Sequence, residues 1–179
     1  KLNQIILLSL PLTLLSFIDD FKNIKIRYRL IAQIITSILL VLNGNIFSLN
    51  FTPIGLVIFS FLILISMTTI NMSNFMDGLD GMLAGCMLLI IMTSSIYLNL
   101  TSPILFVILG SVFCFFIFNF YPAKIFMGDV GSVFLGCIYS GIIFQSTNVE
   151  SLIAILLLAT PLYADICITI IRRFFNNQN

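Results

Sequence analysis

Seven apolar runs separated by short polar segments dominate the pattern of the chain. The runs cover about 4–18, 28–43, 53–71, 82–98, 103–119, 131–147 and 151–171. A helix needs roughly 20 residues to cross the hydrocarbon of a bilayer, and the shorter runs reach that length by tilting or by extending into their flanks. The pattern therefore predicts an all-α fold, a polytopic membrane helix bundle with about seven transmembrane helices.

The charged residues fall almost entirely on one side of the membrane when the runs are taken as alternate crossings. The basic residues on that side are Lys22, Lys25, Arg27, Arg29, Lys124, Arg172 and Arg173, and only Lys1 lies opposite. The positive-inside rule assigns this side to the cytoplasm. The acidic residues there are Asp19, Asp20, Asp77, Asp80, Asp129 and Asp165, with Glu150 alone opposite. The positive-inside rule does not explain acidic residues, so their gathering indicates a functional site.

Composition supports the membrane class and narrows the partners. Hydrophobic residues make up 60% of the chain, charged residues 8%, and the mean hydropathy is +1.16. A net charge of +1 without a basic stripe argues against nucleic acid as a partner. The four cysteines lie inside apolar runs, without the paired spacing of a zinc site, so we interpret them as small buried hydrophobes. The opposite-side loop 43–53 alternates weakly and predicts a small hairpin with a structural role.

The first polar constellation is Asp19-Asp20, followed by a short basic loop that ends at Arg29. Two adjacent carboxylates repel each other unless a cation or a proton relieves them. The pair therefore suits a divalent metal, or a base held near cationic phosphate clamps. A solvated helix end with a compensating basic loop is the alternative.

The second constellation runs from Asn71 to Gly81 and contains Asn74, Asp77 and Asp80. Aspartates three residues apart share a face in a helical turn, with Asn74 one turn earlier on the same face. That arrangement would hold a metal or a polar ring. Helix capping by aspartate is the alternative, although two Asn, two Asp and two Gly exceed what a cap requires.

The third constellation places Asp129 between Gly128 and Gly131 at the start of an apolar run. Carboxylate oxygens suit Mg²⁺, and a glycine-rich helix start offers backbone amides to phosphate. A plain turn with a capping aspartate also fits. Phe126 is placed either to stack on a base or to sit at the membrane interface.

Together these segments resemble a known family of membrane enzymes. Asp19-Asp20 with Arg29-Leu30-x-x-Gln33, Asn-Phe-Met-Asp-Gly-Leu-Asp-Gly over 74–81, and Pro-Ala-Lys-Ile-Phe-Met-Gly-Asp-x-Gly-Ser over 122–132 are similar to the ordered cytoplasmic motifs of the polyprenyl-phosphate N-acetylhexosamine-1-phosphate transferases (glycosyltransferase family 4, membrane type). The variant at Asn74-Phe75-Met76-Asp77 looks most like the O-antigen-initiating subgroup. The match runs from about residue 15 to 173.

The resemblance implies transfer of a sugar-1-phosphate from a UDP-N-acetylhexosamine to undecaprenyl phosphate, a polyprenyl phosphate, with release of UMP. It implies Mg²⁺, with Mn²⁺ as a substitute, and an active site on the cytoplasmic face of a bacterial inner membrane. By motif match, Asp129 and Asp77 are the metal ligands, and the catalytic set is Asp19, Asp20, Asp77 and Asp80. The substrate-binding set is Lys22, Arg29, Asn74, Lys124 and Phe126, where Phe126 would stack on uracil. The oligomeric state stays open, with a homodimer as one option.

One departure from the family pattern bears on completeness. Family members carry a histidine-containing loop beyond the position of Arg172-Arg173, and this chain has no histidine. We therefore expect residues 1–179 to be one membrane-embedded transferase domain that continues beyond both ends, and we expect the chain alone not to turn over substrate. Two alternatives remain for the function. One is the phospho-MurNAc-pentapeptide transferase of peptidoglycan synthesis. The other, from a different class, is an ion-coupled membrane transporter, which would place carboxylates within spans, where only Asp165 qualifies.

Overall fold

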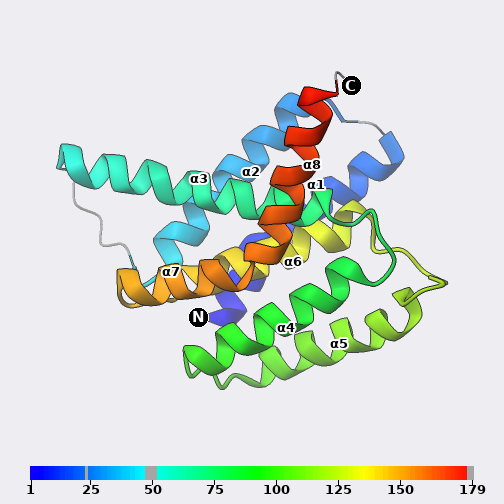
Figure 1. Ribbon diagram of the computed structural model, residues 1–179. Helices are drawn as coiled ribbons and strands as arrows, with labels where there is room; N and C mark the ends of the chain where they lie inside the picture. Colours follow the sequence, from blue (N-terminus) through cyan, green and yellow to red (C-terminus); the bar gives the residue numbers. More distant parts are fainter. Residues whose placement is uncertain (23, 47–51, 177–179) are drawn as a thin grey trace.

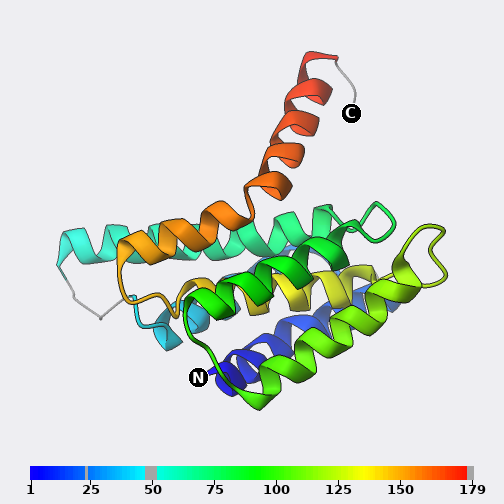
Figure 2. The same cartoon turned by 60° about the horizontal axis from the view of Figure 1, so that its bottom comes forward.

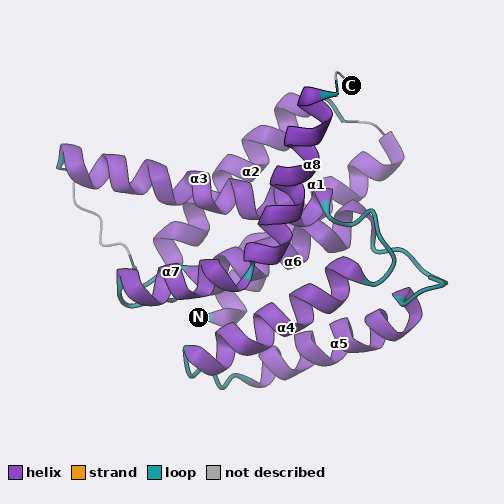
Figure 3. Cartoon of the chain, in the orientation of Figure 1, coloured by secondary structure: helices purple, strands orange, loops and turns teal. Residues whose placement is uncertain are grey.

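The computed structural model describes residues 1–22, 24–46 and 52–176, and within these ranges it is helical with no strand (Figure 3). The helices are α1 (Leu2–Lys22), α2 (Ile26–Asn43), α3 (Pro53–Phe75), α4 (Met82–Tyr97), α5 (Pro103–Asn119), α6 (Gly128–Ile143), α7 (Val149–Leu158) and α8 (Thr160–Phe175). The predicted all-α fold is confirmed. The hairpin predicted over 43–53 falls mostly on 47–51, outside the described residues.

Several helix starts follow from local sequence. Thr52 caps α3 by accepting a hydrogen bond from the Gly55 amide at 3.1 Å, and Pro53 occupies the first turn, where its missing N–H has no cost. Asn148 caps α7 in the same way, accepting from the Ser151 amide at 2.9 Å. These side chains satisfy amides that helix geometry leaves unpaired.

Helix α6 is the centre of the bundle and contacts α1, α2, α3, α4 and α7 (Figure 1). Nearly all its residues from Ser132 to Ile143 are buried, as expected of a helix that is apolar on every side. Small residues let its neighbours approach closely: a Cβ atom built on Gly136 would lie 2.9 Å from the Cα of Ile70 on α3. Polar bonds add to this packing, because the Ser140 hydroxyl donates to Ser66 on α3 at 2.8 Å.

Hydropathy predicted one straight span over the apolar run 151–171, and the structure has two helices there instead. Helices α7 and α8 meet at an angle of 60°, and α8 extends away from the other helices (Figure 2). Pro161 has no N–H to give to the Leu157 carbonyl, and the Thr160 hydroxyl donates to that carbonyl instead at 2.6 Å. The break therefore follows from the proline and from a side chain that replaces its missing hydrogen bond.

Helix length separates the predicted spans into two groups. Among the described residues, α1, α2 and α3 are long and apolar enough to cross a membrane, and the bent pair α7–α8 counts as a fourth if it is one span. Helices α4, α5 and α6 are apolar but only 16, 17 and 16 residues long. The turn after α3 and the segment before α6, which carry the second and third constellations, lie at the same end of the bundle, at the right of Figure 1.

Candidate active site

Arg29 links the first and third constellations. It lies in the first turns of α2, and its guanidinium reaches Asp19 in the last turn of α1 and Asp129 in the first turn of α6. The Nη1 atom is 3.3 Å from Asp19 Oδ2, and the Nη2 atom is 2.9 Å from Asp129 Oδ2. The Arg29 and Asp19 side chains are 29% and 17% exposed, so this ion pair is partly shielded from water and from salt, whereas the Asp129 side chain is 38% exposed. One arginine thus fixes two carboxylates that arrive on different helices.

Asn74 joins the second constellation to the same group. The orientation of its amide that satisfies every neighbour turns the nitrogen toward Ser132 Oγ at 2.7 Å and Asp129 Oδ1 at 3.1 Å. The amide oxygen then accepts from Arg29 Nη2 at 2.7 Å. The Ser132 hydroxyl in turn donates to the Gly128 carbonyl at 3.0 Å. Both oxygens of Asp129 are therefore occupied, one by Arg29 and the other by Asn74.

Asp77 lies in the turn that follows α3, close to the start of α6. Burial raises the pKa of its carboxyl, hydrogen bonding from the Gly128 backbone opposes the rise, and the nearby Asp129 carboxylate adds to it, so that the pKa moves from 3.8 to about 6 in all. Two carboxylates near each other in a partly buried site favour either a proton or a cation between them. Asp77 and Asp129 are thus brought together, as the sequence predicted.

The adjacent aspartates of α1 have different surroundings. Asp19 is held by Arg29 and also accepts a hydrogen bond from the Ile24 amide at 2.5 Å, so its carboxylate is committed to the protein. Asp20 is exposed, and its Oδ2 atom lies 4.0 Å from the position that a Cβ atom would take at Gly128. Asp20 therefore faces the start of α6 with its carboxylate accessible.

Asp80 does not share a face with Asp77, contrary to the prediction of a helical turn. Residues 76–81 form a non-helical turn, and Gly81 has a φ of 71°, in the left-handed region. The Asp80 carboxylate instead accepts a hydrogen bond from the Ala123 amide at 3.0 Å. Asp80 thus braces this turn against the segment that precedes α6.

Asn119, to which the sequence pattern assigned no role, makes a second bridge between the same two segments. Its side chain is only 4% exposed, and its Oδ1 atom accepts from the Gly81 amide at 3.0 Å. Its Nδ2 atom donates to the Ile125 carbonyl at 2.8 Å. A carboxamide has both a donor and an acceptor, which explains why this residue can join two backbones. The only sequence signal was a carboxamide at the end of a strongly apolar run.

The remaining predicted substrate-binding residues lie around this group without contacting it. Lys22 and Lys124 are exposed, and neither takes part in an ion pair with another described residue. Phe126 is 75% exposed, in the segment that Asp80 and Asn119 brace. The structure therefore leaves these three side chains free to meet a ligand.

Comparison with known proteins agrees with this arrangement of motifs. The model of glycosyl transferase family 4 matches residues 2–147. The chain belongs to this family. It is 30% identical, over 92% of its length, to a Bacillus subtilis (strain 168) protein named "Probable undecaprenyl-phosphate N-acetylglucosaminyl 1-phosphate transferase", of which it covers 50%. The family resemblance inferred from the sequence is confirmed, and with its apolar helices the chain is a multi-pass membrane protein.

Other relatives in family 4 are named for a different activity. The chain is 29% identical to a phospho-N-acetylmuramoyl-pentapeptide-transferase of Prochlorococcus marinus (strain NATL2A), covering 78% of this chain and 44% of the relative. It is 32% identical to a protein of the same name from Borreliella burgdorferi (strain ZS7), covering 78% and 52%. The chain spans about half the length of the curated relatives it matches.

The family 4 site contains oxygen donors that fit a magnesium ion, but not a complete cage. Within residues 1–22, 24–46 and 52–176 no group of three or more His, Cys, Asp or Glu side chains comes together as a metal site. Mg²⁺ does not need such a cage, because it commonly binds one or two carboxylates together with waters and substrate phosphates. Asp129 and Asp77, the pair assigned to the metal by motif match, lie near each other, and metal binding by them stays a prediction.

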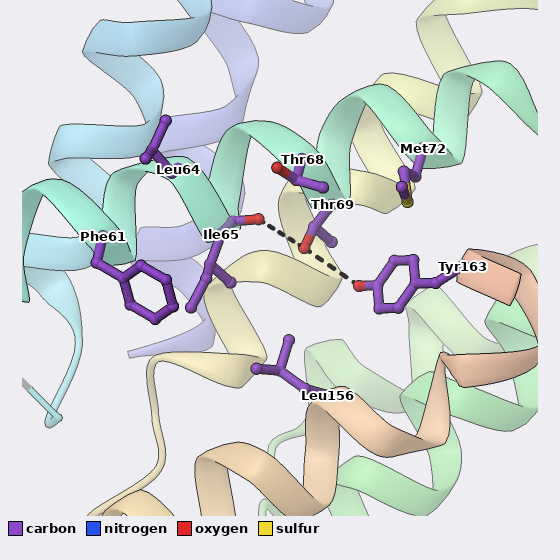
Figure 4. Close-up of a pocket in the computed structure, with 8 residues that line it drawn as sticks. All are labelled: Phe61, Leu64, Ile65, Thr68, Thr69, Met72, Leu156 and Tyr163. Carbon is purple, nitrogen blue, oxygen red and sulfur yellow. Dashed lines mark hydrogen bonds between the residues drawn. The ribbon is translucent and has the colours of Figure 1, made fainter. Parts of the chain in front are cut away.

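An apolar groove of about 220 Å³ lies between α3 and the bent pair α7–α8, as Figure 4 shows. It is lined by Phe61, Leu64, Ile65, Thr68, Thr69, Met72, Leu156 and Tyr163. The hydroxyls of Thr69 and Tyr163 are 3.3 Å apart, which ties α8 to α3 across the groove. Met72, at one end of the lining, lies two residues before Asn74, so the groove extends along α3 toward the polar site.

Proposed function

We propose that the protein transfers an N-acetylhexosamine-1-phosphate from a UDP-sugar to undecaprenyl phosphate and releases UMP, on the cytoplasmic face of a bacterial inner membrane. The observation that carries the proposal is the meeting of Asp19, Arg29, Asn74, Asp77 and Asp129 at the ends of α1, α2, α3 and α6. Family membership supports the reaction class, and the name of the Bacillus subtilis relative supports undecaprenyl phosphate as the acceptor.

The reaction brings one phosphate anion onto another, which decides what the site has to supply. An oxygen of the lipid phosphate forms a bond to the phosphorus that carries the sugar, and the bond from that phosphorus to the oxygen of UMP breaks. Positioning and charge neutralisation are the main contributions that a protein makes to such a transfer. A divalent cation, Mg²⁺ or Mn²⁺, held by Asp129 and Asp77, would neutralise the diphosphate when bound.

The chain's own side chains have distinct roles in this proposal. Asp20, whose carboxylate is accessible, orients the acceptor phosphate or takes its remaining proton, whereas Asp19 is committed to holding Arg29. Lys22 and Lys124 are the exposed cations that bind phosphate oxygens. Phe126 presents an exposed ring on which uracil stacks. Asp80 acts by positioning the Phe126 segment, because its carboxylate is used by the Ala123 amide.

The apolar groove between α3 and α8 provides a path for the acceptor's hydrocarbon tail. Packing a polyprenyl chain along apolar side chains lowers its free energy. The groove extends toward the polar site, where the phosphate of the same lipid would bind. A transporter would instead require carboxylates inside the spans. Asp165, the residue that qualified by sequence, is exposed on α8 rather than packed within the bundle.

The test is the charge of Asp129. In the full-length protein, Asp129→Asn should lower the rate of UMP release at least a hundredfold, which corresponds to about 2.7 kcal/mol of transition-state stabilisation. Glu150→Gln is the matched control, because it removes an exposed carboxylate in the first turn of α7, a helix that contributes no residue to the polar group around Asp129. The assay uses undecaprenyl phosphate with UDP-N-acetylglucosamine and, separately, with UDP-MurNAc-pentapeptide, which distinguishes the two family activities. Near-normal release by Asp129→Asn would mean that the metal is assigned to the wrong carboxylate.

A further inference from the structure

Arg29 is paired with one oxygen of Asp129, the residue proposed to hold the metal. Its Nη2 atom is 2.9 Å from Asp129 Oδ2, and the Asn74 amide nitrogen is 3.1 Å from the other oxygen, Oδ1. A second contact fixes the guanidinium from the opposite side, since Nη1 is 3.3 Å from Asp19 Oδ2. The guanidinium therefore lies between two carboxylates, as a bound metal ion would. Each oxygen of Asp129 has a partner within the protein.

A divalent ion at Asp129 then has to compete with a positive charge built into the protein. A guanidinium group does not lose its proton in proteins, so this positive charge stays beside Asp129. Arg29 can leave Asp129 only if another anion replaces Asp129 as its partner. A diphosphate suits the planar guanidinium fork well. The nucleotide would bring that anion together with the cation.

We propose that Arg29 is an internal counter-ion of Asp129 that exchanges partners when substrate binds. Without nucleotide, Arg29 neutralises Asp129 and keeps metal affinity low. When a metal and the nucleotide diphosphate bind together, Asp129 would hold the metal and Arg29 would pair with a phosphate oxygen instead. The site thereby discriminates against free cations and favours the metal–nucleotide complex. The identity of the anion rests on the proposed function, whereas the competition between Arg29 and a cation does not.

The decisive measurement is metal binding in the absence of nucleotide. Mn²⁺ affinity is measured by electron paramagnetic resonance on the full-length protein in nanodiscs. Arg29→Gln should bind Mn²⁺ at least tenfold more tightly than the wild type, because a competing charge is gone. The same variant should bind Mn²⁺ together with UDP more weakly, because the diphosphate loses its arginine. A purely structural arginine would give the opposite sign in the first measurement.

Arg27→Gln is the matched control. Arg27 is exposed in the same first turns of α2 and forms no ion pair with another described residue. Arg27→Gln removes the same charge from the same helix turn as Arg29→Gln. Mn²⁺ affinity should stay within about twofold of the wild type, as expected for a screened surface charge. An equal gain in both variants would mean a general field effect and would overturn the exchange.

A second variant keeps the proposal testable if Arg29→Gln does not fold. Arg29→Lys retains the charge, but one ammonium cannot bridge Asp19 and Asp129 as two Nη atoms do, so Mn²⁺ affinity should rise about threefold. Unchanged or weaker affinity in the folded Arg29 variants, or no saturable Mn²⁺ binding in either of them, would overturn the proposal. Failure of the proposed function has a different signature: no UMP release by the wild type from either UDP-sugar, while Arg29→Gln still gains Mn²⁺ affinity.

Discussion

Gly136 sets the distance between α3 and α6, two of the four helices whose ends form the site. A methyl group at this position would lie 2.9 Å from the Cα of Ile70 and 2.9 Å from the Oγ of Ser73, both on α3. The serine hydroxyl can rotate away, but the Ile70 Cα is part of a helix backbone and cannot. Nonbonded carbons prefer separations of about 3.5–4.0 Å, so Gly136→Ala should push α3 and α6 apart by roughly 0.5–1 Å.

Two opposing energies decide the sign of the effect on stability. Overpacking of this kind costs about 1–3 kcal/mol, while alanine is a better helix former than glycine by up to about 1 kcal/mol. We therefore expect Gly136→Ala to lower the free energy of unfolding by about 1–2 kcal/mol. The same displacement reaches the site, because Asn74 and Ser132 lie about one turn from this contact on their respective helices. A misplacement of about 1 Å can reduce turnover on the order of a hundredfold.

Thermal unfolding followed with a thiol-reactive dye measures the first effect. Cys137 on α6 is fully buried and reports unfolding, while the partly buried Cys86 and the exposed Cys114 and Cys167 are replaced by Ser in every variant. Gly110→Ala is the control, because a Cβ atom at Gly110 on α5 meets no atom within 4 Å. This control should melt at or slightly above the wild-type temperature. If Gly136→Ala melts as high as Gly110→Ala and keeps full activity, the close approach of α3 and α6 does not position the site.

Three further predictions address the carboxylates and the topology. Because the pKa of Asp77 is raised to about 6, its carboxylate is mostly ionised at pH 7 and mostly protonated at pH 5. Mn²⁺ affinity measured without lipid should therefore fall about tenfold from pH 7 to pH 5. Asp77→Asn should bind Mn²⁺ weakly, with an affinity that does not change over this pH range. A wild-type profile that stays flat down to pH 5 would contradict the raised pKa. Asp80→Asn keeps an oxygen for its backbone partner and should reduce UMP release less than tenfold, while Asp80→Ala should reduce it further by loosening the loop; equal and complete loss in both variants would indicate direct catalysis. Cysteines introduced at Lys22, Leu79 and Lys124 in a cysteine-free background should all react with a membrane-impermeant reagent from the cytoplasm, since all three positions are exposed; labelling of any one from the other side would separate the constellations.

The apolar runs determined the helices well, because hydrocarbon thickness sets a length that can be read directly from the residues. Proline shows the limit of that approach. Pro11 lies inside α1 without ending it, whereas Pro161 accompanies a 60° bend between α7 and α8. The apolar pattern is similar around both prolines. The packing of neighbouring helices and the Thr160 hydroxyl decide the outcome, and neither can be read from hydropathy.

The sequence also predicted which segments come together, because alternate crossing of the membrane brings loops that are distant in the chain to one side. It did not determine their partners. Asp77 and Asp80 are equally spaced for one helical face, yet the chain leaves the helix at Phe75, and only Asp77 turns toward Asp129. Asn119 became a bridge only when the two loops met. Arg29 was predicted to bind phosphate, and the tertiary structure places it between Asp19 and Asp129, because partly buried carboxylates are stabilised by a paired positive charge.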